Sequence, residues 1–178
     1  LDVNTANAAG TFNATVANTP FNVTWNSINA TLATTPTTIM TSVGSITVAA
    51  DSAGSAAGGV TGNGNLLHLN SGNQTFINFN ITAVGANGTA PMQFTAPNGI
   101  FLGSNLSSNG GNITFANATT VTTNPTINAG AGNVRFNGTV NSNTTAESLT
   151  VNSSGNTTFT QAVGGASTLT TLTTDAGG

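Results

Sequence analysis

The chain has 178 residues, of which only 3% are charged, and its formal net charge is −3 from one Arg and four acidic residues, with the single His neutral. So little positive charge argues against binding to nucleic acid or to an anionic membrane surface. The absence of Cys excludes disulfides and thiolate metal sites, and no apolar run approaches the ~20 residues that a membrane-spanning helix needs.

Short stretches of alternating apolar and polar residues follow one another along the chain. In chain order they predict strands at residues 12–16, 21–25, 46–48, 67–69, 76–81, 113–115, 134–136, 149–151 and 169–173. Clusters of Gly, Asn, Ser and Pro separate these stretches, as turns do, and the small-residue segment 51–59 is predicted to be a loop or linker. Because helical spacing is rare and β-branched residues dominate, the sequence predicts an all-β protein.

One motif recurs at nearly constant spacing. Gly-Asn-Ile-Thr-Phe at 111–115 returns as Gly-Asn-Val-Arg-Phe at 132–136 and as Gly-Asn-Thr-Thr-Phe at 155–159, after 21 and 23 residues. A more distant copy, Gly-Asn-Gln-Thr-Phe at 72–76, begins 39 residues before the first. A period in the low twenties, filled with short strands and turns, predicts a β-solenoid of about eight or nine coils, each with two strands. The motif Phe residues are expected to stack as the structural core of the repeats: Phe76, Phe115, Phe136 and Phe159.

The regularity of the repeats divides the chain into two regions. Residues 99–178 are predicted to be regular solenoid repeats. Residues 1–98 are predicted to be an irregular N-terminal β region, which either caps the solenoid or exchanges a strand with a neighbour.

The repeats also resemble a known family. The copies at 111–115 and 132–140, with Ser-Leu-Thr-Val-Asn at 148–152 and Ala-Val-Gly-Gly at 162–165, are similar to repeats of filamentous-haemagglutinin-like bacterial surface proteins, many of which use two-partner secretion. The resemblance covers about 80 residues. It implies a right-handed parallel β-helix, secretion across an outer membrane, and a role in adhesion or matrix.

Residues suited to chemistry are few and scattered. No two of the acidic residues are close enough in sequence to suggest a general acid–base pair: Asp2, Asp51, Glu147 and Asp175. His68 lies in an apolar run without a second His, so we interpret it as a hydrogen-bonded structural residue. Arg135 is expected on the outward side of its strand, and Trp25 in the core or a cap. We therefore predict no catalytic residue, no metal and no cofactor.

Asn-x-Ser/Thr sequons are frequent, which makes glycosylation a hypothesis that suits a secreted protein. The candidate acceptors are Asn13, Asn22, Asn29, Asn73, Asn80, Asn87, Asn105, Asn112, Asn117, Asn137, Asn143, Asn152 and Asn156.

The sequence favours a non-catalytic structural or adhesive solenoid in the extracellular space, as a segment of a bacterial surface fibre or adhesin. Its partner would then be a host or cell-surface glycan or protein. The alternative is a complete subunit of a self-assembling filament, sheath or surface layer, which would contact its own copies end to end or by strand exchange. A polysaccharide-acting β-helix enzyme is the third and least favoured interpretation, because fold alone does not imply activity.

Overall fold

The computed structural model describes residues 11–14, 28, 32–49, 58–60, 62–83 and 89–175. Within these ranges the chain folds into strands β1 to β18 with almost no helix. The expectation of an all-β protein is therefore confirmed. The predicted strand at 21–25, Trp25 and most of the predicted loop at 51–59 lie outside the described residues.

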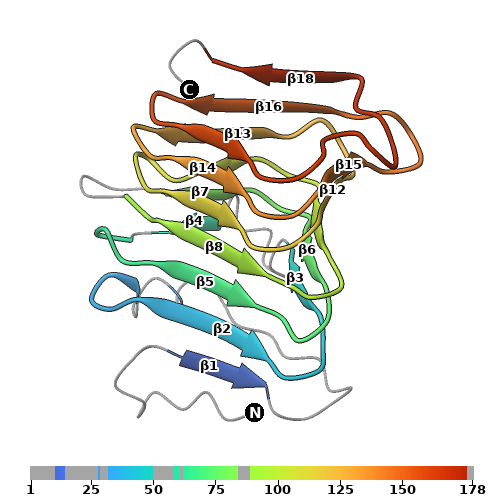
Figure 1. Cartoon of the computed structure of the whole chain (residues 1–178). Coiled ribbons are helices and arrows are strands. Elements are labelled where there is room, and N and C mark those ends of the chain that lie inside the picture. Colours follow the sequence, from blue (N-terminus) through green and yellow to red (C-terminus); the bar gives the residue numbers. More distant parts are fainter. Residues whose placement is uncertain are drawn as a thin grey trace.

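The strands form three parallel sheets that make the three walls of a solenoid (Figure 1). One wall has seven strands in the order β1 (Thr11–Ala14), β2 (Thr37–Thr41), β5 (Leu67–Asn70), β8 (Met92–Thr95), β11 (Ile113–Phe115), β14 (Val134–Phe136) and β17 (Thr157–Phe159). The five-stranded wall runs from β3 (Ile46–Val48) through β6 (Thr75–Ile77), β9 (Ile100–Leu102) and β12 (Thr119–Val121) to β15 (Val140–Ser142). The six-stranded wall runs from β4 (Gly58–Val60) through β7 (Ile81–Ala83), β10 (Leu106–Ser107), β13 (Thr126–Gly130) and β16 (Ser148–Ser153) to β18 (Thr171–Thr174).

From β2 to β16 successive strands enter the three walls in strict rotation, so each coil contains three strands rather than the expected two. The five-stranded wall spans four complete turns between β3 and β15, and the expected count of eight or nine coils is not confirmed by the described residues. The early coils are longer: the partners Ile39 and Leu69 are 30 residues apart, and Leu69 and Phe94 are 25 apart. They use more chain per turn than the motif spacing suggests.

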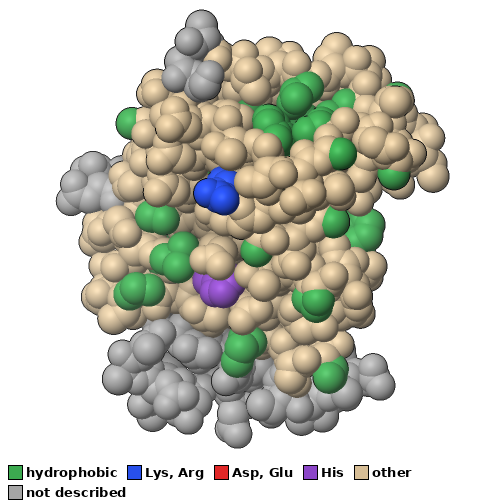
Figure 2. All heavy atoms as spheres, viewed as in Figure 1, with side chains coloured by type: hydrophobic (Ala, Val, Ile, Leu, Met, Phe, Trp, Pro, Cys, Tyr) green, Lys and Arg blue, Asp and Glu red, His purple; other side chains and the backbone are tan. Residues whose placement is uncertain are grey.

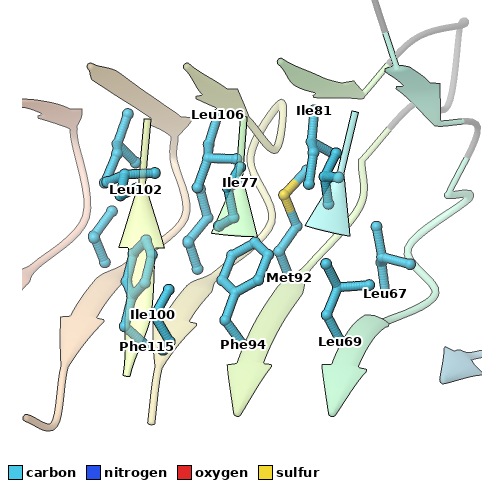
Figure 3. Close-up of a cluster of buried hydrophobic side chains, with 14 of the residues drawn as sticks. Leu67, Leu69, Ile77, Ile81, Met92, Phe94, Ile100, Leu102, Leu106 and Phe115 are labelled. Carbon is cyan, nitrogen blue, oxygen red and sulfur yellow. The ribbon is translucent and has the colours of Figure 1, made fainter. Parts of the chain in front are cut away.

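The core fills the space between the walls. Along each strand buried and outward residues alternate, as in Ile113–Phe115, where the two outer residues are buried and the middle one is not. Figure 3 shows how Leu67, Leu69, Met92, Phe94 and Phe115 of the seven-stranded wall point towards apolar side chains of the other two walls. Burial of these side chains supplies the main driving force for stacking the coils.

The predicted strands at 46–48, 113–115 and 134–136 match β3, β11 and β14. The single strand predicted at 76–81 is wrong, because β6 ends at Ile77, β7 begins at Ile81, and a corner lies between them. Alternation continues through this corner in the sequence, so periodicity alone did not reveal it. The strand predicted at 169–173 is displaced to β18.

The division expected after residue 98 falls between β8 and β9, which belong to one coil, and β8 pairs in register with both β5 and β11. The division into two regions stays a prediction. In the N-terminal region β1 pairs with β2 of the same chain, in parallel and in the register of the seven-stranded wall.

Candidate functional site

The recurring motif builds one corner and one wall of each late coil. Its Gly lets successive corners approach closely: a Cβ on Gly132 would overlap the backbone carbonyl of Gly111. Its Asn bonds to the next coil, since Asn112 Oδ1 accepts the backbone N–H of Asn133 (2.8 Å) and Asn133 Oδ1 accepts that of Asn156 (2.7 Å). The Gly-Asn pair therefore marks a corner where coils are held by amide side chains.

The Phe of the motif forms a column of parallel rings inside the seven-stranded wall. Ring centroids lie 5.2 Å apart for Phe94 and Phe115, 4.5 Å for Phe115 and Phe136, and 4.9 Å for Phe136 and Phe159. Phe115 and Phe136 are fully buried, and Phe159 is half-buried at the end of the column. These spacings match the ~4.8 Å separation of strands, so each coil adds one ring.

Phe76 does not belong to this column. It lies on the outward side of β6 in the five-stranded wall, partly exposed, and stacks with Phe101 at 4.8 Å. The copy at 72–76 therefore precedes a different wall from the other three, and the assignment of Phe76 to the repeat core is corrected. The buried ring one coil before Phe115 is Phe94, which lacks the Gly-Asn prefix.

Asparagine amides hold other corners in the same way. Asn80 Oδ1 accepts the backbone N–H of Asn105, and Asn105 Oδ1 accepts that of Thr126 (2.9 and 2.7 Å). Amide side chains also bond to each other between coils, as in Asn152 to Asn128 at 2.8 Å. An asparagine accounts for much of its hydrogen-bonding capacity here without any ligand.

The titratable residues lie apart from one another. His68 is half-buried on the outward side of β5, its Nε2 shares a hydrogen bond of 2.9 Å with Thr95 Oγ1, and burial lowers its pKa below the ordinary value of 6.5. Glu147 Oε1 accepts a hydrogen bond from Thr145 Oγ1 (2.5 Å), and Asp175 Oδ2 accepts the backbone N–H of Ser153 (2.7 Å). Across the described ranges no three His, Asp or Glu side chains gather where a metal could bind. Asp2 and Asp51 lie outside those ranges.

The outward side of the seven-stranded wall carries His68 and Arg135 in one register row, together with Thr38, Gln93, Thr114 and Thr158 (Figure 2). Arg135 is exposed, as expected, and its Nε donates to Asn137 Oδ1 at 2.5 Å. This row offers hydroxyl, amide and guanidinium groups but no carboxylate.

The sequons occupy unequal positions. Asn143 is exposed on the turn between β15 and β16, and its side chain has no hydrogen-bond partner among the described residues. Asn152 uses its Nδ2 in the bond to Asn128, the atom that a glycan would have to occupy. The other exposed sequon asparagines are Asn80, Asn105, Asn112 and Asn156, while Asn73, Asn117 and Asn137 are half-buried. Asn22, Asn29 and Asn87 lie outside the described residues, as does the side chain of Asn13.

The end of the solenoid at β17 and β18 leaves apolar side chains uncovered (Figure 2). Phe159, Val163 and Leu169 are only partly buried against the core, and Leu172 is 40% exposed. Thr157 Oγ1, at an inward register position of β17, is buried without a hydrogen-bond partner. The sequence did not single out this end, because Leu169 and Leu172 alternate like any other strand.

Comparisons of the chain with protein-family models, curated proteins and solved structures found no match. The resemblance to filamentous-haemagglutinin-like repeats therefore stays a prediction. A search of the described part of the chain for a helix long and apolar enough to cross a membrane found none.

Proposed function

We propose that this chain is a non-catalytic structural or adhesive β-solenoid of the cell surface, a segment of a bacterial surface fibre or adhesin. The observation that carries the proposal is the repeated construction of the late coils, each with the same Gly-Asn corner and the same ring in the Phe column. Such a stack extends along one axis and presents a long lateral surface, which suits a spacer or an adhesive face.

We infer that the solenoid is right-handed. The path of the chain in Figure 1 supports this inference, because the strands at the front run one way and the chain returns behind them as it climbs. Right-handed connections between parallel strands are also the rule, since they follow from the twist of the strands.

The outward row of the seven-stranded wall supports an adhesive role with an uncharged partner. Thr114, Thr158 and Gln93 present hydroxyl and amide groups at strand spacing. These groups donate and accept hydrogen bonds without a net charge, which suits the hydroxyl groups of a neutral glycan or the polar surface of a protein. A ligand that spans several coils would meet one such group every ~4.8 Å.

Antibody against the purified chain, applied to intact cells of the source organism, tests the location. We expect labelling of intact cells outside the envelope. Labelling that appears only after lysis would contradict the surface role.

Beads coated with the chain, passed over glycan-coated and protein-coated surfaces, test adhesion, with Gln93→Glu and Thr114→Glu as variants that place charge in the row. We expect weaker retention of the variants at unchanged folding. A polysaccharide-degrading activity that disappears in Glu147→Gln would instead favour the enzyme interpretation.

A further inference from the structure

The two outer edges of the seven-stranded wall are compatible with each other. β1 stands at one edge and β17 at the other, and every pairing between them is parallel. A second copy, displaced along the solenoid axis without reversal, therefore brings its β1 beside β17 in the direction that the wall already has. No rotation of strand polarity is needed.

The edge at β17 has backbone groups ready for a further strand. Asn156 O accepts from Val134 N (2.9 Å) and Thr160 N donates to Phe136 O (3.0 Å), so the backbone of Asn156 and Thr160 faces β14. Because backbone groups alternate in a parallel ladder, the N–H and C=O of Thr157 and Phe159 face away from β14. They are the groups to which a next strand would bond.

The register also places an aromatic residue where the Phe column stops. Phe12 pairs with Ile39, and the same register position continues through Leu69, Phe94, Phe115 and Phe136 to Phe159. β1 of a second copy, added to β17, would put Phe12 at the register position next to Phe159. The partly exposed Leu169 and Leu172 lie at the same end.

The edge strands lack the usual protection against such pairing. β1, β17 and β18 read Thr-Phe-Asn-Ala, Thr-Thr-Phe and Thr-Leu-Thr-Thr, with no Lys, Glu or Pro. Proteins that must stay monomeric commonly place charges or Pro on exposed edge strands.

We propose that the β17–β18 end of one copy binds the β1 edge of a second copy, with Phe12 in register with Phe159. This inference rests on the structural role proposed above and names a second copy of the chain as the partner. The contact is head-to-tail, so each copy keeps one edge of each kind and repeated addition gives an open filament.

Two variants block the two ends separately. Leu172→Lys places a charge at the inward position of β18, with Thr173→Lys as the matched control on the outward side of the same strand. Phe12→Asp places a charge at the column position of β1. Thr157→Pro removes an N–H that faces away from β14, a position where an edge strand tolerates Pro.

Sedimentation and electron microscopy of the purified chain measure the assembly, and circular dichroism verifies folding of each variant. We expect filaments from the wild type and from Thr173→Lys, and monomers from Leu172→Lys, Phe12→Asp and Thr157→Pro. An equal mixture of Leu172→Lys and Phe12→Asp should give dimers, because each variant retains one intact end.

A wild-type chain that stays monomeric would overturn the proposal. So would filaments of folded Leu172→Lys that equal those of Thr173→Lys, or a mixture that forms no dimers. If Thr157→Pro fails to fold, the two Lys variants still decide. Surface labelling with a monomeric chain removes this contact and keeps the proposed function, whereas filaments with purely internal labelling do the reverse.

Discussion

Replacing Phe136 with Ala should be among the most destabilising single changes in the solenoid. Phe136 is fully buried, and its ring lies parallel to those of Phe115 and Phe159, at 4.5 and 4.9 Å. Truncation of a buried Phe costs about 3–5 kcal/mol in lost transfer energy and cavity formation. We expect the upper part of this range, because the backbone ladders on both sides fix the coil spacing and prevent the neighbouring rings from closing the gap.

Equilibrium denaturation followed by circular dichroism measures this loss. Arg135→Ala is the matched control, since Arg135 is the exposed neighbour on the same strand, and its replacement should change stability by no more than about 0.5 kcal/mol. Phe159→Ala should lie between the two, because Phe159 is half-buried and has a stacking partner on one side only. The denaturant slope must be compared as well, since solenoids can unfold in stages.

Equal losses at residues 135 and 136 would refute the assigned alternation of inward and outward residues. A loss for Phe159→Ala as large as that for Phe136→Ala would contradict the partly exposed end of the column in a monomer.

Three further predictions concern the corners, the histidine and the sequons. Gly132→Ala should destabilise the fold by about 1–3 kcal/mol because its Cβ would overlap the carbonyl of Gly111, whereas Gly44→Ala, with only Thr41 Cβ nearby at 3.9 Å, should be tolerated; thermal melts of both variants check this. Burial lowers the pKa of His68 below 6.5, so its contribution to stability should be complete above that pH and be lost as the pH falls towards the folded-state pKa; an NMR titration midpoint at or above 6.5 would contradict this. If the native protein is glycosylated, mass spectrometry of its peptides should find the glycan on Asn143 and not on Asn152, whose Nδ2 bonds to Asn128.

The fold class could be predicted because two local signals agree. Alternation in segments such as 113–115 and 134–136 marks strands, and the Gly-Asn pair marks a corner that only a small residue fits. The number of strands per coil could not be predicted, because short strands such as β10, with two residues, carry too little periodicity to be recognised. The coil count followed the late period and missed the longer early coils.

The candidate site was less accessible to sequence reasoning. Phe76 and Phe136 follow the same five-residue motif, yet Phe76 is outward in one wall and Phe136 inward in another. Residue 76 follows its Gly by the same spacing, so only the pairing of β6 with β3 and β9 shows which wall it enters. The uncovered end at β17 and β18 depends on which strand is last in the stack, and this is a property of the whole assembly rather than of a motif.

The central claim is that the coils stack in parallel register, since both the structural role and the end-to-end contact follow from it. Disulfide formation between engineered cysteines tests it directly, because the natural chain has no Cys. Thr114 and Arg135 are outward register partners on β11 and β14, and Thr158 lies one coil further on β17. Adjacent strands are about 4.8 Å apart, within disulfide range, and alternate strands are about twice that distance, beyond it. We expect Thr114→Cys with Arg135→Cys to form an intramolecular disulfide under mild oxidation and Thr114→Cys with Thr158→Cys not to form one; the opposite result, or no disulfide in either, would contradict the stacked register.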